Sequence, residues 1–196
     1  MDATAFWRVI GQYNSQTKII QILFLLFLIV GLALSYTKKV KWAAKFVLGI
    51  SSIFIGIVFF GIYGTEPIQH FFALPLYLCC GFLFLFECIK NKDDVLKRPA
   101  KWQFALLILF ALYPLISYVL GNTFPQMVTY IMPCPIVSLS IAVYAGYDKK
   151  NRLLLLLLTI WGLTGIKSLL FNAYEDIILL VSGVYGIVVL MKDKKR

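Results

Sequence analysis

The most specific chemical feature of the sequence is the tripeptide Pro133-Cys134-Pro135, which stands inside a long apolar stretch. Two prolines remove two backbone N–H donors from a helix, so carbonyl groups about one turn earlier lose their partners. A thiol among such carbonyls can bind a soft metal ion or take part in thiol–disulfide exchange. Cysteine is also a common small packing residue, and packing at a helix kink is the interpretation that we favour.

Three charged residues near the end of the chain form the second group of candidates. Lys167 lies inside an apolar stretch, and Glu175 with Asp176 begins the next one. An ionisable side chain at membrane depth predicts a functional role with a charged partner, here one of these two acids or Glu66. The alternative is that Lys167 extends its ammonium group to the lipid headgroups and that the acids stabilise the first turn of a helix.

Metal-ligating residue types are few. The single histidine, His70, follows Glu66 by four residues, and these two with Asp176 could hold a metal ion; Cys134 is a further weak candidate. The four cysteines lack the paired spacing of a zinc site, and no phosphate loop, nucleophile elbow or HExxH motif is present. The sequence therefore identifies no cofactor, and a protein without catalytic activity is the favoured interpretation.

Prolines inside apolar stretches are confined to the middle of the chain, at Pro75, Pro114, Pro133 and Pro135. Such a proline frees carbonyl groups and bends the helix, which is tolerated where the backbone is buried in protein or borders a wet cavity. We predict that these breaks surround a substrate pathway, which Tyr130 and other residues of the outer loops would border. The alternative is that the bends serve packing alone, because proline is common in membrane helices.

The elements that position these residues are predicted to be membrane helices. The chain has 196 residues, of which 61% are hydrophobic, against about 45–50% in a typical soluble domain. Seven apolar stretches are each long enough to cross roughly 30 Å of hydrocarbon as a helix. They cover residues 19–36, 42–63, 71–89, 102–121, 127–147, 153–171 and 174–191. The spacing of apolar residues within residues 1–18 predicts a short amphipathic helix that lies in the membrane interface. The predicted fold class is all-α, a polytopic seven-helix bundle that forms one transmembrane domain over residues 1–196.

Basic residues set the predicted orientation of this bundle. They gather after the first, third, fifth and seventh stretches, whereas the other side holds only Arg8 and Lys18. The positive-inside rule then places the N-terminus outside and the C-terminus in the cytoplasm. The net charge of +10 lies in short loops beside lipid headgroups, so we expect no nucleic-acid partner. The gathered residues are Lys38, Lys39, Lys41, Lys45, Lys90, Lys92, Lys97, Arg98, Lys101, Lys149, Lys150, Arg152, Lys192, Lys194, Lys195 and Arg196.

Five short motifs along the chain resemble those of a known family when they are taken together. They are residues 6–14 ahead of the first stretch, residues 113–118 with Gly121 in the fourth, residues 123–125, Pro133-Cys134-Pro135, and residues 175–183 in the last stretch. In these motifs the chain resembles an uncharacterised bacterial family of small multi-pass membrane proteins, over most of its length. The resemblance implies a bacterial inner membrane and supplies no activity. The family pattern has a small uncharged residue where this chain has Lys167, so it implies no family-wide role for that lysine.

The lack of room for a soluble domain and the concentration of helix breaks predict a small permease or channel-like protein for a small solute or ion. Two alternatives stay open. One is a membrane protein that handles thiols or metal through Cys134, and the other is an accessory or scaffold subunit of a membrane complex. We expect the lipid bilayer as its surroundings, with another membrane protein or a second copy of the chain as the candidate protein partner. The substrate, the coupling ion and the oligomeric state stay open.

Overall fold

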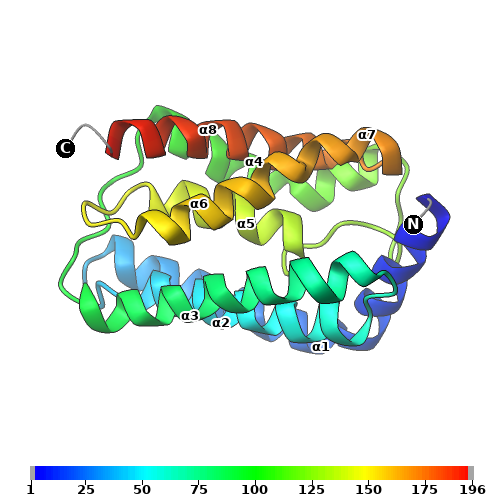
Figure 1. Cartoon of the computed structure of the whole chain (residues 1–196), viewed down its shortest axis with the longest axis horizontal. Helices are drawn as coiled ribbons and strands as arrows, with labels where there is room; N and C mark the ends of the chain where they lie inside the picture. Colours follow the sequence, from blue (N-terminus) through cyan, green and yellow to red (C-terminus); the bar gives the residue numbers. More distant parts are fainter. Residues whose placement is uncertain (1–2, 194–196) are drawn as a thin grey trace.

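The computed structural model describes residues 3–193, in which all regular elements are helical (Figure 1). The α-helices are α1 (Ala3–Tyr36), α2 (Ala43–Phe54), α3 (Leu74–Lys90), α4 (Lys101–Val119), α5 (Pro133–Tyr144), α6 (Arg152–Leu163), α7 (Ser168–Phe171) and α8 (Ile177–Asp193). Shorter segments adjoin them: the π-helical η1 (Ile55–Ile62) and η2 (Gln69–Ala73), and the 3-10 helices η3 (Thr164–Lys167) and η4 (Tyr174–Asp176). The predicted all-α class is confirmed.

Within the described residues, six helical stretches are long and apolar enough to cross a membrane. They coincide with every predicted span except the fifth, and they fit a multi-pass membrane protein. Large apolar side chains such as Leu23, Phe82 and Leu170 face outward, where they suit contact with lipid. The six stretches are Ala3–Tyr36, Ala43–Ile62, Gln69–Lys90, Lys101–Val119, Arg152–Phe171 and Tyr174–Asp193.

The predicted fifth span, residues 127–147, does not form a full membrane helix. Only the 12 residues of α5 are helical there, and a helix of that length reaches roughly 18 Å, too short to cross the hydrocarbon. Met132 has extended backbone angles and Pro133 is the first helical residue, because the residue before a proline disfavours the helical conformation. The structure thus differs from the predicted seven spans, since irregular backbone leads into a half-length helix.

The short helix α5 occupies the centre of the bundle. Figure 1 shows it between α1, α2 and α3 on one side and α4 and α8 on the other, with α6 crossing beside it. All of its residues are buried except Cys134, which is half-buried. An apolar surface all round suits a helix that is surrounded by other helices.

The N-terminal segment differs from the predicted separate interfacial helix. α1 runs without interruption from Ala3 to Tyr36, so residues 3–18 and the first predicted span form one helix; residues 1 and 2 lie outside the described part. Tyr13, Asn14 and Thr17 are buried within this segment. No proline interrupts this helix.

α6 packs closely against α8, and this contact positions the following segment η3, which carries Lys167. A Cβ atom on Gly162 would lie 2.6 Å from the Cα atom of Gly183, so no larger residue fits at this contact. Small residues allow membrane helices to approach closely and gain van der Waals contact. The contact sets the direction in which α6 continues into η3 and α7.

Most of the basic loops lie together at one end of the bundle, here called the basic end and formed by residues 37–42, 91–100 and 145–151. Lys97 Nζ lies 2.7 Å from Asp148 Oδ1, and the backbone N–H of Lys97 donates to Gly146 O at 3.2 Å. Lys194, Lys195 and Arg196 lie outside the described residues. The opposite end, here called the N-terminal end, carries the start of α1 and residues 64–68, 120–126 and 172–173 (Figure 1).

Candidate functional site

Polar side chains of α1 hold the irregular backbone that precedes α5. The Asn14 amide Nδ2 donates to the carbonyl oxygens of Pro125 and Met127, both at 2.8 Å. The Tyr13 hydroxyl donates to the Ile131 carbonyl at 2.6 Å. Irregular backbone at membrane depth needs such donors, because an unsatisfied carbonyl costs several kcal/mol in hydrocarbon.

Thr129 ties the same irregular segment to two more residues of α1. Its hydroxyl donates to Gln21 Oε1 at 2.7 Å, and Gln21 Nε2 donates to Thr17 Oγ1 at 2.9 Å and to Asn14 Oδ1 at 3.1 Å. Asn14, Thr17 and Gln21 follow one another at spacings of three and four residues, which is one face of a helix. This polar stripe was the sequence signal for the broken segment, and our sequence analysis did not use it.

Two further tyrosines satisfy carbonyl groups next to the predicted helix breaks. Tyr77 of α3 donates to Pro133 O at 2.8 Å, and Tyr130 donates to Ala111 O at 2.9 Å, one turn before Pro114. α4 stays helical through Pro114. Only the fifth predicted span is thus broken, and hydroxyl groups of other segments bond carbonyl groups close to the prolines of both spans.

The two acids of η4 are buried at the junction of α4, α5 and α8. Asp176 Oδ1 accepts from the Tyr113 hydroxyl at 3.0 Å, and its carboxylate also lies against the Cys134 thiol. Glu175 Oε1 accepts from Ser117 Oγ at 2.6 Å, whereas Glu175 Oε2 is buried without a partner within the described residues. Asn122 Nδ2 of the loop before α5 also donates to Glu175 Oε1 at 3.3 Å, so Glu175 holds this loop to α4, whereas Asp176 faces the first turn of α5.

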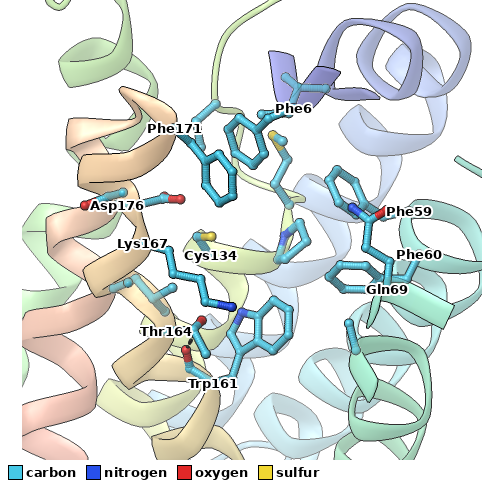
Figure 2. Close-up of a pocket in the computed structure, with 18 of the residues that line it drawn as sticks. Phe6, Phe59, Phe60, Gln69, Cys134, Trp161, Thr164, Lys167, Phe171 and Asp176 are labelled. Carbon is cyan, nitrogen blue, oxygen red and sulfur yellow. Dashed lines mark hydrogen bonds between the residues drawn. The ribbon is translucent and has the colours of Figure 1, made fainter. Parts of the chain in front are cut away.

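A cavity of about 340 Å³ lies beside this first turn of α5 (Figure 2). Its aromatic wall residues are Phe6, Phe59, Phe60, Phe72, Trp161 and Phe171. Its polar wall residues include Gln69, Cys134, Thr164, Lys167, Ser168 and Asp176. Small-molecule sites are mostly apolar with a few convergent polar groups, and this volume lies near the lower end of their range of about 300–1,000 Å³.

The structure brings together six of the predicted site residues around this cavity. Pro133, Cys134 and Pro135 line it from α5, Lys167 from η3 and Asp176 from η4, and Glu66 contributes from the loop before η2. The elements come from separate parts of the sequence. These residues meet at one cavity because α5 begins inside the bundle and its first turn forms part of the cavity wall.

Four other predicted residues lie outside this cavity. Tyr130 borders a smaller hollow of about 190 Å³ together with Asn14 and Gln21 of α1. Pro114 lies inside α4, and Glu175 points to Ser117 of that helix. Pro75 lies in the first turn of α3, directly after the π-helical η2.

The predicted metal ligands are only partly brought together. Glu66 and Cys134 line the same cavity, whereas His70 is exposed and is not among the residues that line it. Within residues 3–193, no group of three or more His, Cys, Asp or Glu side chains is placed to hold a metal ion.

A second buried polar cluster lies near the basic end. Lys45 is fully buried, its Nζ lies 3.9 Å from Glu87 Oε2, and it donates to Asn91 O at 3.1 Å. The same ammonium group lies 4.4 Å from the centre of the Tyr147 ring, within the range of a cation–π contact. The sequence analysis grouped Lys45 with the basic residues of the loops and did not predict its burial.

Comparison of the sequence with family models gives a match over almost the whole chain. The model of a family of unknown function, DUF6064, covers residues 3–196. This chain belongs to that family. No curated protein and no solved structure matches the chain. The predicted membership of an uncharacterised family is thus confirmed, and the DUF6064 assignment adds no activity to the geometry described above.

Proposed function

We propose that this DUF6064 protein is a small permease of the bacterial inner membrane and that the cavity beside α5 holds a small solute during its passage. The observation that carries the proposal is the cavity at the start of a half-length helix. In many transporters the substrate site lies near the bilayer midplane, where helices are broken and irregular backbone borders the site. Residues 120–132 and their donors from α1 have this character.

The charges suggest which way the cavity faces. The positive-inside rule assigns the basic end to the cytoplasm, so the N-terminal end and the cavity would face outward. From Pro135 to Tyr144, α5 is buried on every side. Passage of a solute from the cavity to the cytoplasm therefore requires α5 or its neighbours to move, as in alternating access.

A pair of cysteine substitutions tests the permease proposal. Cys134→Phe places a ring in the cavity, whereas Cys79→Phe adds the same ring on an exposed position of α3. We expect wild type and Cys79→Phe to take up at least one solute from a panel of radiolabelled carboxylates, amines and amino acids in proteoliposomes. Uptake by Cys134→Phe should fall by about tenfold or more, because the ring occupies the space of the solute. Thermal unfolding midpoints of the three proteins check their folding.

Two results would count against the permease. One is an absence of protein-dependent uptake over the whole panel, and the other is equal uptake by Cys134→Phe and Cys79→Phe. Cys134→Ala separates the permease from a thiol- or metal-handling protein, because it removes the thiol and leaves the cavity open. We expect Cys134→Ala to retain uptake. A scaffold subunit would instead show no uptake and would co-purify with a fixed membrane partner.

A further inference from the structure

Three hydrogen-bond donors at the cavity lack an acceptor within the described residues. Trp161 Nε1 and Ser168 Oγ are buried and make no hydrogen bond of normal geometry in the described part, although the Tyr77 hydroxyl, which donates to Pro133 O, lies near the Trp161 indole. Lys167 has no ion pair within residues 3–193, although Glu66 and Asp176 line the same cavity. Lys167 and Trp161 line the same cavity, and Figure 2 shows the Lys167 side chain extending into it. A buried donor without an acceptor is costly, so the site is complementary to a group that accepts hydrogen bonds.

The Asp176 carboxylate on the cavity wall already has other partners. Asp176 accepts from the Tyr113 hydroxyl and lies against the Cys134 thiol, on the side of the cavity formed by α5 and η4. Lys167 remains exposed through the opening of the cavity, so an anion that enters can reach it. An ammonium group and an indole N–H on the same mostly apolar cavity wall can provide both charge and a hydrogen bond to one anionic group.

The rest of the cavity favours an apolar body on the same ligand. The Phe6 and Phe171 rings stack with centroids 5.1 Å apart, and the Phe60 and Trp161 rings meet edge to face at 5.3 Å. Such rings offer large apolar surfaces and flat faces for a ligand ring or chain. A volume of about 340 Å³ suits a small molecule and excludes a bulky polar one.

We propose that the cavity binds a small carboxylate with an aromatic or aliphatic body, whose carboxylate accepts from Lys167 Nζ and Trp161 Nε1. This rests on the proposed function, because it names the class of solute that the permease would carry. The same chemistry occurs in free aryl acids and in fatty acids released from lipid. The Phe-lined wall holds the body in either case, and Lys167 selects for the negative charge.

Four probes of similar size and different charge test the ligand class. They are 4-phenylbutyrate, octanoate, 4-phenyl-1-butanol and 4-phenylbutylamine, with binding to the purified protein in nanodiscs measured by equilibrium dialysis. We expect at least one of the two carboxylates to bind about tenfold or more tightly than the alcohol and the amine. Preference for 4-phenylbutyrate would identify a free aryl acid as the source, and preference for octanoate a lipid-derived acid.

Lysine variants assign the charge selectivity to one residue. Lys167→Met should weaken carboxylate binding by about tenfold or more and leave the alcohol unchanged, whereas Lys167→Arg should retain carboxylate binding. Lys18→Met removes another exposed lysine, which lies over the Phe124 ring and outside the cavity, and should change nothing. The inference is overturned if Lys167→Met binds carboxylate like wild type.

The same data separate this inference from the proposed function. If the amine or the alcohol binds best and Cys134→Phe abolishes that binding, the cavity is a solute site and the assignment to carboxylates is wrong. If all four probes fail to bind wild type, the carboxylate assignment is wrong, and the uptake panel alone then decides on the permease.

Discussion

Replacing Glu87 with leucine is expected to lower the free energy of unfolding by about 3–5 kcal/mol, because it leaves the buried ammonium group of Lys45 without its carboxylate. The Asn91 carbonyl and the Tyr147 ring would remain as direct partners of that charge, and neither carries a full negative charge. The Asp94 carboxylate would also remain nearby, but it does not form an ion pair with Lys45 as Glu87 does. Unfolding in mild detergent by titration with sodium dodecyl sulfate measures the loss.

The matched control is the double variant Lys45→Leu with Glu87→Leu. It removes both charges and replaces them with apolar groups, and such replacements of buried pairs are often neutral or stabilising. We expect the double variant to recover most of the stability lost by Glu87→Leu alone. If both variants are equally destabilised, the two side chains do not interact and the pairing is incorrect.

The second large effect is expected from Asn14→Leu. The substitution removes the two hydrogen bonds to Pro125 O and Met127 O and leaves two carbonyl groups of the irregular segment unsatisfied. Each buried unsatisfied group costs about 1–3 kcal/mol, so a loss of about 2–6 kcal/mol in the free energy of unfolding is expected. The same detergent titration measures it.

Gln16→Leu is the control for this second substitution. Gln16 lies on the exposed face of the same helix, so the change also replaces an amide by leucine but breaks no contact with residues 125–131. We expect its stability to stay within about 0.5 kcal/mol of wild type. Similar losses from both substitutions would show that α1 does not hold the irregular segment.

Much of the fold could be predicted because hydrocarbon leaves the chain few alternatives. An apolar stretch of sufficient length must satisfy its own backbone as a helix, and six stretches followed this rule. Residues 127–147 did not, although their composition is equally apolar. Donors more than a hundred residues away, on Tyr13 and Asn14, let this segment stay irregular, and such long-range partners are not visible in local composition.

The candidate site could be predicted in part for a similar reason. Cys134, Lys167 and Asp176 were identifiable because a thiol between prolines and charges in apolar stretches are unusual locally. Trp161 and Ser168 were not, since tryptophan and serine are ordinary residues of membrane helices and only the path through α6, η3 and α7 turns them to the cavity. Burial of Lys45 depended on the contact between α2 and α3, which brings Glu87 to it.

The most direct test of the cavity is labelling of Cys134 with a small membrane-impermeant thiol reagent in intact cells. The variant tested carries Cys79→Ala, Cys80→Ala and Cys88→Ala, and a second variant keeps Cys88, near the basic end, as its only cysteine. We predict that Cys134 is labelled from outside and that 4-phenylbutyrate or octanoate slows the reaction, whereas Cys88 is not labelled from outside. A Cys134 that reacts only after denaturation would contradict a water-accessible cavity beside α5 and, with it, the proposed solute site.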